Sequence, residues 1–579
     1  MPKRIYLSRI KFEELSESEN VQDFSTVGRN GARVGGPLPK AKNQKANAAP
    51  GISARIYRTG PLSPSSRRSR SWASHRLIRL FPDEAEFPLV PPPFIRRFET
   101  ARNLFASRFM KWETLLNPHR PRKSTVIADF REEFERDFDR SIFSTPVKRL
   151  QDKAQVFPLD PCDAVRTRLT HSLEVSSVAR GLAAKLGKWL LEKGEIKPGM
   201  ERQLEAVSGT SALIHDLGNP PFGHAGEDAI RDWFEKHASS SHPELSPTEF
   251  FKREFDGADQ RSQDLLKFEG NAQTLRLVTK LQLLADFNGL NLTFATLSAA
   301  CKYTAASHQA DRSHPNKAMR KPGYFASEND IVRRVRDETG TGDSRNPITY
   351  LVEAADDIVY SVADIEDGIK KGVISWREIE ERLKKQGSEV TEKLASVLGI
   401  KDGILKAGRP EIPNYLPDDT HGSAFRTASI SVCVKDAFSA FTTHYQEIKD
   451  GTYQGDLMTG CESSQFIEAL KQIGVDRIYC TPSTLKLELM GRQIIGDLMT
   501  LFWEGAEALP LDRDPKTNSF PGRIGALLSR NYREVFKDAR KTDPSAPERY
   551  HRYQLVTDYV CGMTDSFACR IHHELFDAA

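Results

Sequence analysis

The sequence lacks the features of membrane, secreted and zinc-ribbon proteins. No apolar run approaches eighteen residues, so no transmembrane helix is predicted. The first residues, MPKRIYLSRIKFEELSE, are basic but contain no uninterrupted apolar stretch, which disfavours a secretory signal. The seven cysteines are scattered without CxxC spacing, as expected for reduced thiols. We therefore expect a cytoplasmic protein with no membrane partner.

The motifs of the common nucleotide-binding sheets are missing as well. No GxxxxGKS, GxxxxGKT or GxGxxG stretch follows a predicted strand, which disfavours P-loop and Rossmann sites. Alternating patterns typical of strands are scarce, whereas apolar residues recur at helical spacing in several long segments. The sequence therefore predicts an all-α, mainly helical fold.

Basic residues concentrate at the N-terminal end of the chain. The 579 residues carry a formal net charge of +4, and residues 1–109 contain 20 Lys and Arg against 9 Asp and Glu. This segment has few periodic apolar positions, so we expect it to be disordered. It is either an extension that catalysis does not need or a basic arm for nucleic acid. We predict three regions, with the extension at 1–109, a core at 110–370 and a C-terminal helical region at 371–579.

One peptide, SALIHDLGNPPFGHAGED at residues 211–228, organises the functional interpretation. It begins as the end of an apolar helix that carries His215 and Asp216, and its glycines and prolines then force a tight turn. His224 and Glu227 follow that turn. An imidazole nitrogen and a carboxylate oxygen on adjacent residues suit Mn, Fe, Zn, Ni or Mg. The peptide therefore predicts a metal site whose other ligands lie elsewhere in the chain.

A further histidine lies on the preceding predicted helix. His171 is in the first turn of that helix, and Arg168 is three residues earlier, so the two side chains share a helix face. A single helical histidine is more often an ordinary core or surface residue. Its position near an arginine and ahead of the His-Asp helix favours a role in the same site.

The segment YLVEAADDIVYSVADIEDGIK, residues 350–370, carries a line of polar side chains. Asp356, Tyr360 and Asp364 are spaced by four and therefore stack along one helix face. Clustered carboxylates without basic neighbours require a cation or protons. Asp357 is a competing metal ligand, and spacing alone separates it only weakly from Asp356.

Residues 304–346 are polar and contain Gly, Pro and His, which predicts a long loop or lid. Its lysines, Lys317 and Lys321, are candidates for phosphate contacts, although a solvated lysine is the commoner case.

In chain order, His171, His215-Asp216 and Asp356 resemble the H…HD…D signature of the HD-domain phosphohydrolases. The peptides RTRLTHSLEV, HDLGNPPFGHAGE, FEGNAQ, YLVEAADDIVYSVADIED and DYVCGMTD together resemble the bacterial deoxyguanosine triphosphate triphosphohydrolases. The likeness runs from about residue 110 to the C-terminus. It implies a helical HD-domain core with additional C-terminal helices that complete the nucleotide site and the contacts of a homo-oligomer. It also implies hydrolysis of a dNTP, with dGTP favoured, to the deoxynucleoside and inorganic triphosphate.

The resemblance further implies roles for individual residues. A divalent ion (Mg, Mn or another transition metal) would be held by two His and two Asp, and the family places its metal Asp four residues before a Tyr and eight before an Asp. The implied metal ligands are His171, His215, Asp216 and Asp356. Arg168 would lie near a phosphate, Tyr360 and Asp364 near the sugar, and Gln151 or Gln155 near the sugar 3′-OH. The vertebrate SAM-and-HD-domain dNTP hydrolase, which resembles this pattern more distantly, carries a histidine four residues after its HD pair. Asn219 stands at that position here, as in the bacterial pattern.

The chemistry of the residues agrees with this resemblance. Hydrolysis of a triphosphate requires charge neutralisation, and Arg168 and Lys302 can clamp phosphate oxygens. His224 titrates near neutral pH, and Glu227 can hydrogen-bond it at i+3, so we predict that this pair transfers protons. The alternative for His224 is a cap of the following helix. Two other functions stay open, namely another HD phosphohydrolase acting on a different nucleotide or phosphoester, and a nucleic-acid-binding protein without turnover.

Overall fold

The computed structural model describes residues 109–123, 131–282, 286–407, 411–412, 415–511 and 513–577. Except for Phe109, the predicted basic extension therefore lies outside the described residues. Within these ranges the chain is mainly helical and forms two short strands, which confirms the predicted fold class. No helix in the same ranges is long and apolar enough to cross a membrane.

Helices α5 (Arg168–Glu192) and α6 (Met200–Ile214) form a hairpin that carries the first half of the candidate site. The Thr167 hydroxyl caps α5 by accepting a hydrogen bond from the Thr170 N–H. Apolar residues recur at helical spacing along α5 and are fully buried, namely Val175, Ala179, Leu182 and Leu186. Because α6 ends at Ile214, the His-Asp pair follows its last helical residue.

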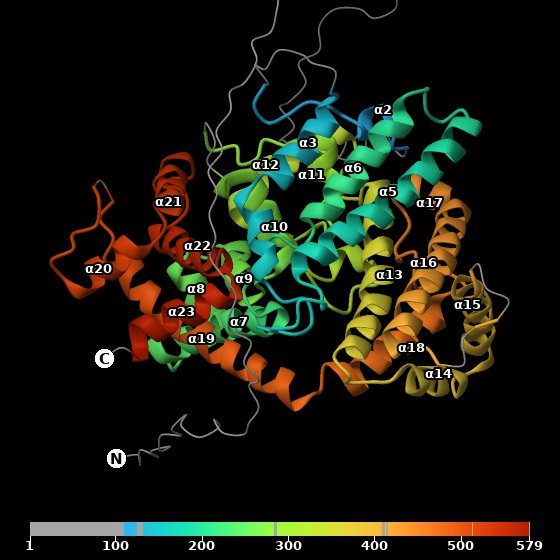
Figure 1. Cartoon of the computed structure of the whole chain (residues 1–579). Helices are drawn as coiled ribbons and strands as arrows, with labels where there is room; N and C mark the ends of the chain where they lie inside the picture. The colour runs from blue at the N-terminus through green and yellow to red at the C-terminus, as the bar shows by residue number, and fades with distance from the viewer. Residues whose placement is uncertain are drawn as a thin grey trace, which may run out of the picture. The chain divides into compact units, whose positions relative to one another are not determined.

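Helix α13 (Pro347–Lys370) belongs to a first apolar cluster together with α5 and α6. Pro347 occupies its first turn, and the Asn346 side chain accepts a hydrogen bond from the Ile348 N–H at 2.9 Å. Figure 1 shows α13 in yellow beside α5 and beside α16 (Asp418–Thr443) in orange. Since α13 is covered on more than one side, its carboxylates require partners within the protein.

A second apolar cluster joins α7 (Gly223–Ser241) to two C-terminal helices, α19 (Pro482–Glu507) and α22 (Glu548–Cys561). Trp503 and Tyr553 stack in this cluster with their ring centroids 3.9 Å apart. The C-terminal helices therefore pack directly on the helix that follows the His-Asp turn.

Helix α6 contributes to both clusters. Leu204 and Val207 belong to the first cluster, whereas Leu213 and Ile214 belong to the second. The His-Asp pair therefore lies where the two clusters meet, and its placement depends on the packing of both.

The segment 304–346 is more structured than the long loop that its polar composition predicts. It contains strand β1 (Ala305–Ala306), which pairs in parallel with β2 (Pro322–Tyr324), and helix α12 (Asn329–Thr339). Strands of two or three residues are too short to show an alternating pattern. Helix α12 is strongly polar, and its buried apolar side consists mainly of two valines, which hides the helical period.

The remaining elements surround this frame. On the N-terminal side they are α2 (Trp112–Leu115), α3 (Glu133–Ile142), α4 (Thr145–Arg149) and the 3-10 helix η1 (Leu150–Asp152). Between α7 and α13 they are α8 (Pro247–Glu254), α9 (Asp259–Leu266), α10 (Gly270–Arg276), η2 (Leu277–Leu281), α11 (Phe294–Ala299), η3 (Lys317–Met319) and η4 (Ala326–Glu328). After α13 they are α14 (Trp376–Lys384), α15 (Ser388–Lys406), α17 (Tyr445–Lys449), α18 (Ser464–Ile473), η5 (Gly474–Ile478), α20 (Phe520–Leu527), α21 (Arg530–Thr542), α23 (Asp565–His572) and η6 (His573–Asp577).

Candidate metal and substrate site

Three of the predicted metal ligands converge on one point. His171 from α5, His215 from the end of α6 and Asp356 from α13 each offer a ligand atom, and these atoms lie within 4.8 Å of one another. The Asp356 Oδ1 lies 3.2 Å from the His171 Nε2 and 3.5 Å from the His215 Nε2. Three segments that are distant in sequence therefore bring two imidazoles and a carboxylate together.

The hydrogen bonds of the two histidines fit a bound cation. The His215 Nδ1 lies 2.7 Å from the Ala212 carbonyl oxygen and donates its proton to it. This contact fixes the tautomer and leaves a lone pair on the buried Nε2, which has no hydrogen-bond partner among the described residues. His171 is 1% exposed, and its Nδ1 also lacks such a partner. The Nε2 atoms of His171 and His215 both face the Asp356 carboxylate, and two imidazoles with one carboxylate form a donor set that suits a divalent metal ion.

Asp216 lies beside this group and is oriented by two other residues. Its Oδ2 is 3.5 Å from the His215 Nε2 and forms an ion pair with the Arg168 guanidinium. Its Oδ1 accepts a hydrogen bond from the Asn219 side chain at 2.8 Å. Burial disfavours the charged imidazole of His215, but the neighbouring Asp216 and Asp356 outweigh it and raise the pKa of His215 to about 9. The carboxylates thus create a site that attracts positive charge.

Asp357 faces a different group from Asp356. Its Oδ1 lies 2.8 Å from the Lys471 Nζ, and it does not belong to the converging group. This arrangement supports the prediction that Asp356 is the ligand of the two.

His224 and Glu227 form the predicted pair in the first turn of α7. The His224 Nδ1 lies 3.2 Å from the Glu227 Oε2, and the Glu227 Oε1 accepts a hydrogen bond from the Gly270 N–H at 2.9 Å. Glu227 is buried, whereas the His224 side chain is 89% exposed and projects into the cavity beside the metal group. The hydrogen bond that His224 donates to the Glu227 carboxylate stabilises the imidazolium and raises the pKa of His224.

The backbone conformation at the start of α7 directs the His224 side chain toward the cavity. Phe222 and Gly223 adopt left-handed φ angles of 61° and 56°, so the chain reverses sharply before the helix. A Cβ on Gly223 would lie 3.1 Å from the Arg168 Nη2, so glycine also gives the arginine room. The sequence signal for the turn is therefore borne out by the backbone.

A buried lysine ties the same loop to the C-terminal helices. Lys153 is 3% exposed, and its Nζ donates hydrogen bonds to the carbonyl oxygens of Asn219 at 2.6 Å and Cys561 at 2.8 Å. Burial lowers the pKa of Lys153 to about 8. The loop that follows the His-Asp pair is thus fixed from α22.

The metal group and the His224 side chain face a common cavity of about 500 Å³. This volume suits a nucleotide-sized ligand. The predicted substrate residues that line it are Gln155, Arg168, Asn219, Lys302 and Tyr360. The Gln155 Oε1 is buried and has no hydrogen-bond partner among the described residues, so it is free to bind a ligand.

Two predicted substrate residues do not line this cavity. Gln151 is exposed and lies outside it, so the structure favours Gln155 of the two glutamines. Asp364 is 1% exposed and accepts a hydrogen bond from the Tyr479 hydroxyl at 2.6 Å. Burial raises the pKa of Asp364 to about 8. Asp364 thus supports Tyr479, which does line the cavity.

Other residues on the wall were not singled out from the sequence. They are Tyr303, Tyr479 and Glu488. Lys321, which the sequence offers as a candidate phosphate contact, lines the same wall. Glu488 is half-buried and forms no hydrogen bond or ion pair with the rest of the described chain. Tyr303, Tyr479 and Glu488 belong to no motif with fixed spacing, so only tertiary packing reveals their place on the wall.

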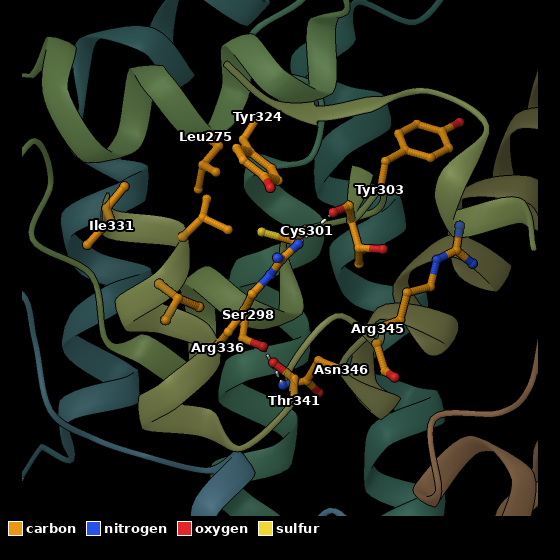
Figure 2. A pocket seen from close by; sticks show the side chains of 14 residues that line it. Leu275, Ser298, Cys301, Tyr303, Tyr324, Ile331, Arg336, Thr341, Arg345 and Asn346 are labelled. Carbon is orange, nitrogen blue, oxygen red and sulfur yellow. Dashed lines mark hydrogen bonds between the residues drawn. The ribbon is translucent and has the colours of Figure 1, made fainter. Parts of the chain in front are cut away.

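A much smaller cavity lies behind Tyr303, as Figure 2 shows. Its volume of about 20 Å³ has room for a water molecule but not for a nucleotide. In Figure 2 the ring of Tyr303 points away from Cys301 and Arg336, which face the small cavity. Of these two cavities, only the one of about 500 Å³ can therefore hold a nucleotide.

Comparison with known proteins yields two family models and several full-length relatives. The HD domain model matches residues 168–267, and the phosphohydrolase-associated domain model matches residues 462–574. A protein of Listeria monocytogenes named deoxyguanosinetriphosphate triphosphohydrolase-like protein is 33% identical over 484 residues, which cover 80% of this chain and 99% of that protein. A protein of Synechocystis sp. with the same name is 32% identical over 485 residues, with coverage of 80% and 99%.

A third relative is named as the enzyme itself, without the words "-like protein". The deoxyguanosinetriphosphate triphosphohydrolase of Yersinia pestis is 31% identical over 485 residues, which cover 77% of this chain and 94% of that protein. The similarity therefore extends far beyond the HD domain and includes the C-terminal helices.

Proposed function

Because the chain belongs to the family of HD-domain, deoxyguanosine triphosphate triphosphohydrolase-like enzymes, we propose that it hydrolyses a dNTP, preferably dGTP, to the deoxynucleoside and inorganic triphosphate. The observation that carries the proposal is the convergence of His171, His215 and Asp356 beside a cavity that His224 also enters. A metal group and a titratable side chain at one nucleotide-sized cavity are what hydrolysis of a phosphate ester requires.

The cation would be held by His171, His215, Asp216 and Asp356. When bound, it would polarise a phosphoryl oxygen and so favour attack at phosphorus. Arg168 orients Asp216 through their ion pair, and its guanidinium remains on the cavity wall, where it can also donate to a phosphate oxygen.

Two lysines on the cavity wall would bind the triphosphate. Lys302 lies 3.7 Å from Asp356 through its Nζ, and Lys321 lies 3.1 Å from Glu269. Both ammonium groups border the cavity and can donate to phosphate oxygens next to the metal group.

The reaction adds one water molecule across the bond between the α-phosphorus and O5′. The water oxygen bonds to the α-phosphorus, the bond from phosphorus to O5′ breaks, and O5′ takes up a proton to become the 5′-hydroxyl. We assign His224 as the group that moves this proton, because its side chain projects into the cavity beside the metal group and its hydrogen bond to Glu227 raises the pKa of the imidazole. Glu227 positions the imidazole through the hydrogen bond to Nδ1.

The remaining residues of the cavity wall would contact the sugar and the base. The free Oε1 of Gln155 can accept a hydrogen bond from the 3′-hydroxyl. The stacked rings of Tyr360 and Tyr479, with centroids 6.3 Å apart, form an aromatic side of the cavity. Guanine presents N1–H and N2–H₂ donors, which an acceptor such as the Glu488 carboxylate can bind. This carboxylate adds to the family relationship as a reason for favouring dGTP.

Product analysis tests the proposal. Purified full-length protein is incubated with each of the four dNTPs and Mg²⁺ or Mn²⁺, and products are separated by ion-exchange chromatography. The proposal requires deoxynucleoside and triphosphate in equal amounts, fastest with dGTP, and an Asp356→Ala control without product. Pyrophosphate or monophosphate as the product would instead favour another HD phosphohydrolase, which is the alternative function.

A further inference from the structure

A second cavity of about 680 Å³ adjoins the candidate active site. The two cavities share four wall residues, namely Lys302, Tyr303, Lys321 and Asp357. The rest of the second cavity comes from the segment between β1 and β2, from the start of α13 and from residues 456–471. It is therefore continuous with the wall that faces the triphosphate.

The charges of the two cavities differ in sign. Three Lys or Arg and six Asp or Glu line the candidate active site, whereas seven Lys or Arg and four Asp or Glu line the second cavity. A divalent ion at the metal group offsets two of the negative charges in the first cavity. A free polyanion is thus attracted from the first cavity toward the second.

Two arginines of the second cavity have no carboxylate partner among the described residues. Arg312 is exposed and forms no hydrogen bond or ion pair there, and Arg320 donates only its Nε, to the His314 carbonyl oxygen at 2.8 Å. The other cations are paired, as Lys317 is with Asp456 and Lys471 with Asp357. Unpaired guanidinium groups in a concave basic site are suited to bidentate binding of phosphate.

We propose that the second cavity is a polyphosphate-binding site that receives the inorganic triphosphate after hydrolysis. This inference rests on the proposed function, which supplies that product. Lys302 and Lys321 border both cavities, so the anion can move without losing cationic contacts. Arg312 and Arg320 then complete its binding on the far side.

Tyr303 forms the boundary between the two cavities. It lines both of them, and the Lys321 Nζ lies 5.8 Å from the centroid of its ring. This contact holds the lysine at the boundary, where a departing triphosphate meets it first.

A binding measurement tests the site directly. Inorganic tripolyphosphate is titrated into the full-length protein by calorimetry, with the double variant Arg312→Ala/Arg320→Ala alongside. Each lost charge-assisted contact is expected to weaken binding about tenfold, and the pair roughly a hundredfold. The matched control is Arg253→Ala/Arg333→Ala, which removes two positive charges from exposed positions outside the cavity and should bind as the wild type does.

Product inhibition supplies the second readout. The double variant should keep the KM for dGTP, while the inhibition constant of tripolyphosphate rises by the same factor as its dissociation constant. If turnover to triphosphate is normal and neither constant changes, the site is overturned and the proposed function stands. If tripolyphosphate binding depends on the two arginines but no dNTP is hydrolysed, the proposed function fails and the anion site stands.

A further arm identifies the source of the polyphosphate. A dNTP that is not hydrolysed is titrated into both proteins under the same conditions. If the arginine pair affects only the nucleotide and not tripolyphosphate, the cavity binds the triphosphate of a second nucleotide, and the role in product release is wrong.

Discussion

The carboxylate of Asp565, at the start of α23, accepts a hydrogen bond from the backbone N–H of Phe222 at 3.0 Å. Its other oxygen accepts the N–H of Ala154 at 2.9 Å. Asp565 is 1% exposed, so both bonds are sheltered from water. One C-terminal residue therefore fixes both Phe222, two residues before His224, and the segment that carries Gln155.

Asp565→Ala is expected to reduce turnover, because the loss of the hydrogen bond to Phe222 lets His224 move out of position. The substitution leaves two buried N–H groups without acceptors, at a cost of about 1–3 kcal/mol each. We expect kcat to fall roughly ten- to hundredfold, by analogy with lost positioning contacts, and Asp565→Asn, which keeps one acceptor oxygen, to recover part of the loss. Steady-state kinetics beside thermal unfolding separate the two effects, and a less stable Ala variant with normal kcat would leave Asp565 a purely structural role.

Asp356→Ala is expected to abolish metal binding, whereas Asp357→Ala should retain it. Asp356 contacts both histidines, while Asp357 is engaged by Lys471. Metal content of each purified variant, measured by mass spectrometry after dialysis against Mn²⁺, decides between them. Metal retained in the first and lost in the second would reverse the assignment.

His224→Ala should bind metal normally and lose about 10²–10⁴ in kcat, the usual contribution of general acid–base catalysis. His242→Ala, which removes a half-buried histidine that contacts Glu244 and Phe250 and does not line the cavity, is the control. Normal turnover in His224→Ala would show that this histidine only begins α7.

Glu227→Gln should move the pH profile of kcat/KM toward lower pH. The carboxylate raises the pKa of His224 by stabilising the imidazolium, so a neutral amide lets that pKa fall toward its ordinary value. The same shift is expected if His224 acts as an acid or as a base, because in both cases the pKa of His224 sets the pH at which kcat/KM changes. An unchanged profile with reduced kcat would mean that Glu227 holds the loop and does not tune the histidine.

Glu488→Gln should reduce the preference for dGTP. If the carboxylate accepts the guanine donors, its loss weakens a charge-assisted contact and lowers kcat/KM for dGTP about ten- to hundredfold. The values for dATP, dCTP and dTTP should change little. Glu504→Gln on the same helix is the control, and an equal loss with all four dNTPs would remove Glu488 from base selection.

Asp264 should make stability depend on pH near neutrality. Burial raises the pKa of this carboxyl to about 7, although Ser307, Tyr550 and the Ala326 N–H all donate to it. The folded state therefore holds a proton that the unfolded state releases above about pH 4, and stability falls as the pH rises toward 7. At about 1.4 kcal/mol per pKa unit the loss is at most about 4 kcal/mol.

The measurement for Asp264 is chemical unfolding at pH 5 and pH 8. Asp264→Asn cannot ionise, so its stability relative to the wild type should improve at the higher pH. A constant difference between the two proteins would show that Asp264 is ionised throughout.

Local spacing explains what the sequence could predict. His215 and Asp216 are adjacent, His224 and Glu227 share one helical turn, and Asp356 lies on a helix with clear apolar periodicity. Such relations are set by the 3.6-residue period and by glycine and proline, so they hold whatever packs around them. The helical fold class follows from the same periodicity.

Residues that meet the site through tertiary packing could not be predicted in this way. Glu488 reaches the cavity because α19 packs on α7, and Asp565 reaches Phe222 across 343 positions of sequence. The same limit left Gln151 and Gln155 as alternatives until the packing of their segment was known. Asp364 shares a helix face with Asp356 but is covered by Tyr479, which spacing alone does not reveal.

The environment of Lys153 makes this lysine a reporter of separation between the Asn219 loop and α22. The Lys153 amine is buried between the Asn219 loop and α22 and donates hydrogen bonds to both. An acylating reagent can modify it only when these two parts move apart. Peptide mapping after brief labelling would therefore report how fast the Asn219 loop separates from α22, without any substitution in the chain.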